Sequence, residues 1–182
     1  IISYEYLINT APMNIFMKIL GRKEDLNLLQ KLSYNKVLVF NLGFEKGCTN
    51  KEHWIYLPEK EYNFYRIGFY NNILNQEKAS MYIEIGFDKN DIINVDEQLK
   101  LTLENLNKMK VIDKNNKLIA YETIIMDPAY VHIEGESLEN IKEHIEKLNN
   151  NNIYSIGRYG AWTYCSMEDA MVAAKELALK LK

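Results

Sequence analysis

Two arginines, Arg66 and Arg158, lie in the most aromatic stretches of the chain, "HWIYLPEKEYNFYRIGFYNN" and "YSIGRYGAWTY". Arginine is rare here, because all but three of the 22 lysines and arginines are lysine. A solvated surface charge needs only lysine, whereas the planar guanidinium of arginine holds a phosphate or carboxylate with two hydrogen bonds or stacks on an aromatic ring. The two stretches therefore predict contacts with an anionic group. Spacing alone leaves open a second interpretation, in which both arginines lie along sheet edges and the aromatic side chains are ordinary core.

The second stretch reads as a strand, a glycine-bearing loop and a helix cap. The predicted strand is Tyr154–Ile156, the loop is Gly157–Tyr164, and Ser166 caps the last helix. Backbone N–H groups point outward at a helix start and the helix dipole adds partial positive charge, which favours an anionic or electron-rich group. Gly157 and Gly160 would let a ligand approach the backbone closely. The spacing matches neither a P-loop nor G-x-G-x-x-G, so it names no particular ligand.

The elements that position these stretches are β-rich segments and amphipathic helices. Tyr, Ile, Val and Phe dominate the predicted strands, which are Tyr4–Asn9, Val37–Phe44, His53–Leu57, Phe64–Tyr70, Ser80–Phe87, Leu118–Met126, Tyr130–Glu134 and Ile153–Ile156. Helices are predicted from Pro12 to Gly21, over Asp25–Leu32, from Asn94 with Glu97 as a capping box, from a Ser137 cap, and from Ser166 with Asp169. Short turns join several successive strands, which favours antiparallel pairing. The predicted fold is α+β, a mainly antiparallel mixed sheet flanked by about five helices.

Composition argues against several classes of partner. The net charge of −3 gives no electrostatic reason to expect nucleic acid. No apolar run approaches the roughly 20 residues that span a bilayer, and the first residues lack the features of a signal peptide. Cys48 and Cys165 form no CxxC pair and the histidines have no metal-ligand spacing, so we expect reduced thiols, a cytoplasmic protein and no metal site. The chain begins without Met inside a predicted strand, and we expect it to be a piece of a longer protein.

Beyond these patterns, the motif "GRYGAWTYCSMEDAM" resembles the C-terminal flavin-contacting motif of the amine-oxidase-like FAD enzymes, which include UDP-galactopyranose mutase and protoporphyrinogen-oxidase-like proteins. "HWIYLPEKEYNFYRIGFYNN" is similar to the W-x-Y-x-P…F-Y-R stretch in the substrate domain of that family, and "YEYLINTAP" to the strand by which the chain returns towards the flavin. After Tyr164 the sequence departs from the mutases and goes straight to "CSMEDA", and Ile73 replaces a tyrosine common in eukaryotic mutases. The resemblance therefore leaves mutase and oxidase chemistry open.

The resemblance also implies roles for individual residues. The substrate would be a small molecule, and a nucleotide sugar is one candidate. It would contact Trp54, Tyr56, Arg66, Arg158 and Tyr164. The cofactor FAD would contact Gly157, Arg158, Gly160, Trp162, Ser166 and Met167. No catalytic acid–base pair is recognisable, because the flavin carries the chemistry in such enzymes.

The family's G-x-G-x-x-G fingerprint is absent, so we expect residues 1–182 to form a single substrate-binding domain with a flavin-contacting segment at about 153–182. The dinucleotide-binding Rossmann part would lie outside this chain. The isolated chain would then be inactive, would not retain FAD, and would self-associate through an exposed apolar face. Two alternatives remain: a stand-alone, non-catalytic module that binds a sugar nucleotide or another diphosphate, and a structural α+β interaction domain.

Overall fold

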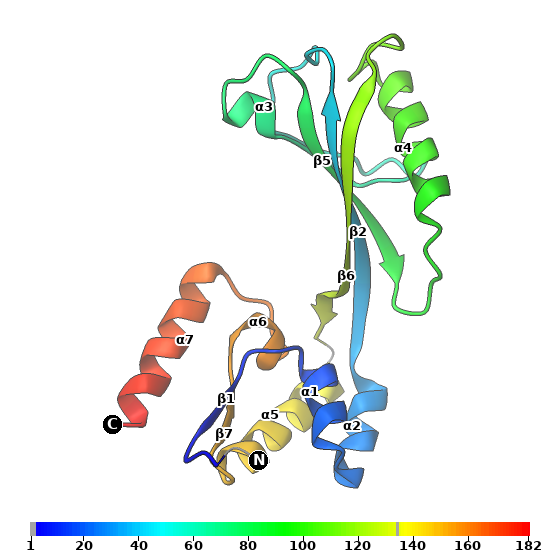
Figure 1. The fold of residues 1–182 in the computed structure, drawn as a ribbon. Helices are drawn as coiled ribbons and strands as arrows, with labels where there is room; N and C mark the ends of the chain where they lie inside the picture. Colours follow the sequence, from blue (N-terminus) through cyan, green and yellow to red (C-terminus); the bar gives the residue numbers. More distant parts are fainter. Residues whose placement is uncertain (1–2, 134) are drawn as a thin grey trace. The chain divides into compact units, whose positions relative to one another are not determined.

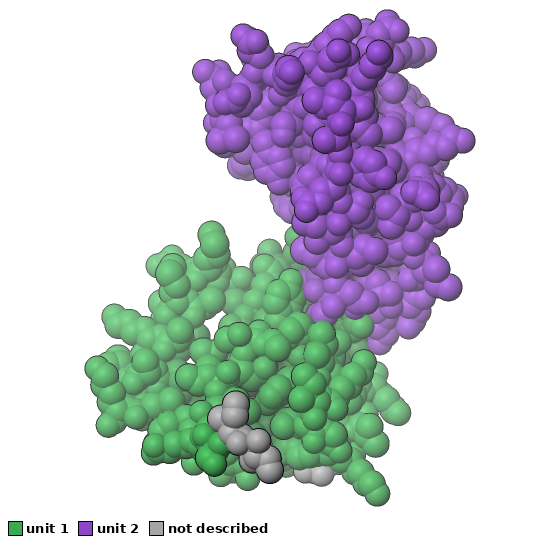
Figure 2. Space-filling view, viewed as in Figure 1, with its two compact units in different colours: residues 1–34, 130–182 green, residues 35–129 purple. Residues whose placement is uncertain are grey.

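The computed structural model describes residues 3–133 and 135–182 and divides the chain into two compact units. Unit 1 contains residues 1–34 and 130–182, and unit 2 contains residues 35–129 (Figures 1 and 2). Within the described residues, no helix has the length and apolar character needed to cross a bilayer.

Unit 2 is built on a five-stranded sheet of order β3-β4-β5-β2-β6. The strands are β2 (Ser33–Phe44), β3 (Trp54–Tyr56), β4 (Arg66–Phe69), β5 (Ser80–Asp88) and β6 (Leu118–His132), the first and last of which continue into unit 1. The pairs β3–β4, β4–β5 and β5–β2 are antiparallel. A single helical turn, α3 (Tyr70–Ile73), follows β4, and α4 (Val95–Lys108) lies along the sheet (Figure 1).

Alternation along the strands separates a core face from an open face. Leu38, Phe40 and Leu42 on β2 are buried and pair with Ile85, Ile83 and Met81 on β5. Because side chains alternate between the two faces of a strand, these residues share one face. The apolar side of α4, including Leu99, Leu103 and Leu106, packs against the same cluster. The predicted capping interaction at the start of α4 is confirmed, since the Asn94 side chain accepts a hydrogen bond from the Glu97 N–H at 3.3 Å.

Unit 1 combines a two-stranded parallel sheet with helices. Its strands are β1 (Leu7–Asn9) and β7 (Ile153–Ser155), paired in parallel. Its helices are α1 (Met13–Leu20), the 3₁₀ turn η1 (Lys23–Asp25), α2 (Leu26–Lys31), α5 (Gly135–Asn149), the short α6 (Gly157–Gly160) and α7 (Met167–Lys180). The core between α1, α2 and α5 includes Met13, Met17, Leu28, Ile141 and Trp162.

The α+β prediction and the five helices are confirmed, with differences in detail. Leu118–Met126 and Tyr130–Glu134 were predicted as two strands, but β6 is one strand that continues through Pro128, and Glu134 lies outside the described residues. β6 is the last strand of the sheet, where the missing N–H of a proline removes no ladder bond on the outer side. The predicted cap at Ser137 is wrong, since α5 already begins at Gly135. The predicted loop after β7 contains the helical turn α6.

Candidate functional site

The open face of the unit 2 sheet carries three of the predicted substrate residues. The pairing of β3, β4 and β5 places Tyr56, Arg66 and Glu84 in one row and Trp54, Gly68 and Tyr82 in the next. We call these six residues the aromatic face. Trp54 and Tyr56 are 56% and 60% exposed, although large apolar surfaces are usually covered in a folded domain. The face therefore offers flat aromatic surface to a ligand.

Arg66 is held by its neighbours on this face. Its Nη1 donates to the Tyr56 hydroxyl at 3.1 Å, and its Nη2 donates to Oε1 of Glu84, with which it forms an ion pair. The other Glu84 oxygen accepts a hydrogen bond from the Tyr65 hydroxyl at 2.5 Å. The guanidinium also lies 5.6 Å from the ring centre of Tyr56 and 5.8 Å from that of Tyr82. Arg66 is thus fixed in position by charge, hydrogen bonds and cation–π contacts.

Gly68 makes room for one ring of the aromatic face. A Cβ at Gly68 would lie 1.9 Å from the ring of Tyr82, so only glycine lets that ring lie over β4. Burial raises the pKa of the Tyr82 phenol above its ordinary value, although the Arg66 guanidinium opposes the shift. Tyr82 therefore stays a neutral hydrogen-bonding group over the pH range in which enzymes work.

In unit 1, Arg158 lies between two aromatic rings. Its guanidinium is 4.5 Å from the ring centre of Tyr164 and 5.2 Å from that of Tyr130. Arg158 lies on α6, directly after β7, and the Thr163 N–H donates to its carbonyl at 3.0 Å, which closes the following turn. Tyr164 is 67% exposed, so the stacked arginine is reachable from solvent on that side. Arg158 and Tyr164, both predicted to contact the substrate, thus lie in contact with each other.

The other predicted cofactor residues differ in exposure. Trp162 is 1% exposed and packs edge-on against Tyr34, with ring centres 5.9 Å apart. Ser166 caps α7 in the predicted capping box: its hydroxyl accepts the Asp169 N–H at 3.1 Å, and its own N–H donates to Asp169 at 2.8 Å. Met167, the first residue of α7, is 86% exposed. Trp162 is therefore anchored in the core, whereas Met167 is open to solvent.

A hollow of about 240 Å³ lies beside this segment within unit 1. Mostly small side chains line it, among them Ser155, Gly157, Ala161, Cys165 and Ala173. A Cβ built at Gly157 would meet no atom within 4 Å, so the backbone is open there. The hollow therefore leaves the backbone at Gly157 accessible to a group from outside the chain.

Gly160 is required for a different reason, because it packs against β1. A Cβ at Gly160 would lie 2.7 Å from the Asn9 carbonyl oxygen and 3.3 Å from Thr10 Cα. The close approach at Gly160 is therefore made by the chain itself.

Gly160→Ala is expected to lower the free energy of unfolding by about 1–3 kcal/mol, as overpacking a tight contact does. The matched control is Gly135→Ala at the start of α5, where a Cβ meets nothing within 4 Å. Urea unfolding followed by circular dichroism measures both. Equal stability of the two variants would show that the contact with Asn9 relaxes freely.

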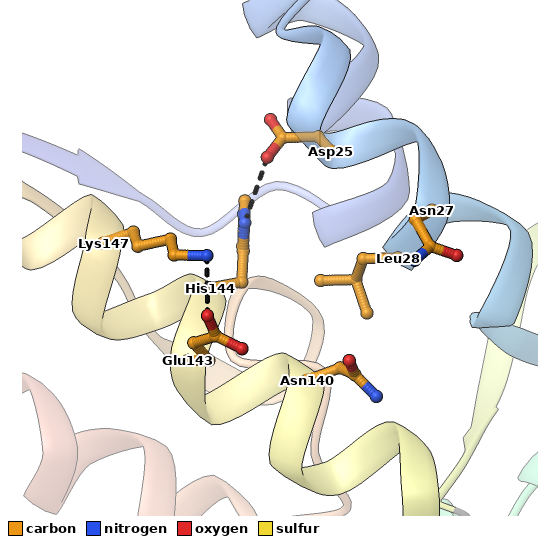
Figure 3. A pocket seen from close by; sticks show the side chains of 7 residues that line it. All are labelled: Asp25, Asn27, Leu28, Asn140, Glu143, His144 and Lys147. Atoms are coloured by element: carbon orange, nitrogen blue, oxygen red, sulfur yellow. Dashed lines mark ion pairs between the residues drawn. The ribbon is translucent and has the colours of Figure 1, made fainter.

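A third polar cluster, which sequence reasoning missed, lies in unit 1 between η1–α2 and α5 (Figure 3). Nδ1 of His144 lies 3.2 Å from one carboxylate oxygen of Asp25, and Nε of Arg22 lies 3.3 Å from the other. The side chains of Asp25 and His144 are only 4% and 6% exposed. They line a pocket of about 160 Å³ with Asn27, Leu28, Asn140, Glu143 and Lys147. Through Asp25 and His144 the cluster links η1 with α5.

The predicted substrate residues thus fall into two groups: Trp54, Tyr56 and Arg66 in unit 2, and Arg158 with Tyr164 in unit 1. Sequence reasoning missed Glu84, Tyr82 and Tyr130. The first two could have been found, because they alternate with the buried Met81, Ile83 and Ile85 in a predicted strand and so face the side that Arg66 faces.

No family model matches the chain. Solved structures do resemble it. The structure of a reduced UDP-galactopyranose mutase (TM-score 0.79, 22% identity) matches over 90% of this chain and 37% of the mutase chain. A protoporphyrinogen oxidase-like protein from Exiguobacterium sp. 255-15 (TM-score 0.69, 15% identity) matches over 97% and 41%, respectively. A CLA-producing fatty acid isomerase from P. acnes (TM-score 0.67, 13% identity) also matches over 97% and 41%.

These likenesses confirm the predicted resemblance at the level of the fold. The chain spans about two fifths of the length of each matched structure. Sequence identities of this size show a shared arrangement of helices and strands. Activity and substrate must be argued from the residues themselves.

Proposed function

We propose that this chain is the substrate-binding part of an FAD-dependent enzyme of the amine-oxidase-like type. The observation that carries the proposal is that each of the two predicted arginines lies among aromatic side chains on an exposed surface. The alternative in which these aromatics are all core is not supported, because Trp54, Tyr56 and Tyr164 are each more than half exposed. Within unit 2, Trp54 and Tyr56 would stack on an uncharged ring of a ligand, and within unit 1, Arg158 with Tyr164 would hold an anionic group.

The segment from Gly157 to Met167 would cover the flavin. Gly157 leaves its backbone open to a ring, Met167 would contribute an apolar contact, and the Ser166 cap would fix the start of α7. When bound, the flavin supplies the redox or covalent chemistry, and the protein supplies orientation and electrostatics. Because Trp162 is buried, it would position this segment by packing in the core and would not contact the flavin with its ring.

We further propose that the dinucleotide-binding part lies elsewhere in a longer polypeptide. Two features of unit 1 support this. Parallel sheets are nearly always larger and covered on both faces, yet β1 and β7 form a parallel pair on their own and Ile8 on β1 is 52% exposed. On α7 only Leu177 is buried, whereas Met167 and Met171 are 86% and 66% exposed. A covering domain would bury these residues, and the chain by itself would self-associate through them.

The substrate that we propose is a small molecule with an anionic group, and a nucleotide sugar fits this chemistry. The likeness to UDP-galactopyranose mutase motivates that choice, while the protoporphyrinogen oxidase-like structure keeps hydride removal as the other reaction class. Cys48 and Cys165 are both free, and we propose the cytoplasm as the location.

The test uses the full-length protein encoded by the same reading frame, purified and scanned for flavin absorbance. We expect bound flavin, and we expect the 182-residue chain alone to retain none. Titration with UDP should then show affinity that falls about tenfold or more in Arg158→Ala, as loss of a charge-assisted hydrogen bond does. Lys114→Ala, which removes the same charge from an exposed position, serves as the control.

The outcomes separate the parts of the proposal. Bound flavin with no UDP affinity would keep the flavoprotein assignment and move the reaction to the oxidase class. A full-length protein without flavin would overturn the proposed function.

A further inference from the structure

Glu84 lies in the row of side chains that holds Arg66. The register of the sheet puts Glu84 directly opposite Arg66, and Arg66 directly opposite Tyr56. The Glu84 side chain is only 8% exposed, whereas that of Arg66 is 23% exposed. The carboxylate is therefore more buried than the guanidinium that it contacts.

This carboxylate already has donors for both of its oxygens. Oε1 accepts from Arg66, and Oε2 accepts from the Tyr65 hydroxyl at 2.5 Å. A buried carboxylate is stable only when it is paired in this way, because desolvation of a single charge is expensive. The positive charge of Arg66 is consequently balanced by the negative charge of Glu84.

Arg158 is in a different electrostatic situation. Its guanidinium lies against the rings of Tyr130 and Tyr164, and among the side chains that the structure describes no carboxylate forms an ion pair with it. Aromatic rings attract a cation without cancelling its net charge. The two arginines are therefore not equivalent, although the family resemblance would give them equal roles at a diphosphate.

We propose that Glu84 is a specificity-determining residue of the aromatic face: by neutralising Arg66 it excludes anionic groups from this face, so that the ligand group lying there is uncharged. The inference deepens the proposed function and rests on it for the identity of the aromatic face as a substrate surface.

The physical reason is charge balance. An anion placed beside Arg66 gains attraction from the guanidinium and meets repulsion from a carboxylate at nearly the same distance, so little net attraction remains. An uncharged ring with hydroxyl groups meets no such repulsion, and it finds aromatic surface at Trp54 and Tyr56. Removing the charge of Glu84 while keeping its shape would release the fork of Arg66 for an anion.

The experiment titrates the 182-residue chain and its variants with inorganic pyrophosphate at low ionic strength by isothermal calorimetry. Glu84→Gln is expected to bind pyrophosphate about tenfold or more tightly than the parent chain, because one charge-assisted fork becomes available. The matched control is Glu122→Gln on β6, which removes the same charge from an exposed side chain that contacts Asn41 and not Arg66. It should remain within about twofold of the parent. Adding Arg66→Gln to Glu84→Gln should abolish the gain.

A second measurement needs no substitution at Glu84. In NMR spectra of the parent chain labelled at arginine, pyrophosphate should move the Nε signal of Arg158 and leave that of Arg66 in place. The proposal is overturned if Glu84→Gln binds pyrophosphate no more tightly than Glu122→Gln, or if the Arg66 signal moves together with that of Arg158. Neither measurement involves flavin, so failure of the proposed function in the flavin test is a separate result.

Discussion

Asp25→Ala is expected to lower the free energy of unfolding of unit 1 by about 3–5 kcal/mol, the loss typical when one partner of a buried ion pair is removed. Asp25 is 3% exposed. One of its carboxylate oxygens contacts His144 on α5, and the other contacts Arg22, which precedes η1. Without the carboxylate, the half-buried guanidinium of Arg22 and the buried imidazole of His144 lose their shared partner. The loss removes the polar tie between the α2 segment and α5.

The measurement is urea unfolding followed by tryptophan fluorescence in a Trp54→Phe background, so that Trp162, in the core of unit 1, is the reporter. Glu143→Ala is the matched control, since Glu143 lines the same pocket but pairs with Lys147 in solvent (Figure 3). The hydrogen bond from Lys147 lowers the pKa of Glu143, yet exposed pairs of this kind contribute little to stability. If Asp25→Ala and Glu143→Ala had the same unfolding midpoint, the Asp25 cluster would carry no stability.

Much of the fold could be predicted, because its signals are local. Alternation at Leu38, Phe40 and Leu42 shows which face of β2 is buried, and a capping box depends on side chains three residues apart, as at Ser166. The same reasoning failed at Ser137. A serine that precedes an apolar helical pattern can cap it or lie inside it, and the choice depends on packing against other elements.

The candidate site could be predicted only in part, for a related reason. Arg66 and Arg158 stand out from sequence alone because arginine is rare in this chain. Their partners Glu84 and Tyr130 lie far from them along the chain, and only the pairing of strands or the packing of α6 brings them together. The burial of Trp162 could not be predicted either, because an aromatic residue near glycines is as typical of a core position as of a ligand contact.

Trp162→Ala is the other substitution for which a large effect is expected, about 3–5 kcal/mol, as for other large aromatic side chains removed from a core. Trp162 is 1% exposed and packs with Met13, Leu28 and Ile141. It also carries a positive φ of 49°, a conformation that disfavours every residue with a Cβ. The side chain must therefore contribute enough packing to hold a strained backbone in place.

Backbone strain and packing can be separated with Trp162→Gly. At ordinary positions glycine is about 0.5–1 kcal/mol less stable than alanine, because it loses more chain entropy on folding. At Trp162 the order should reverse, since glycine adopts the positive φ without strain. Circular dichroism in urea should thus rank the parent chain first, Trp162→Gly second and Trp162→Ala last. A glycine variant less stable than the alanine variant would show that the backbone relaxes once the ring is gone.

The same series connects the core with the proposed site. Trp162 lies one residue before Thr163, whose N–H donates to the Arg158 carbonyl at 3.0 Å, and two residues before Tyr164. Loosening the ring contact should free this turn and let Arg158 leave its position between Tyr130 and Tyr164. Anion affinity at Arg158 should then fall in Trp162→Ala under conditions where the chain is still folded, whereas Leu177→Ala, a core substitution on α7, should leave it unchanged. Equal anion affinity in both variants would mean that the stacked arginine is held by the two tyrosines alone.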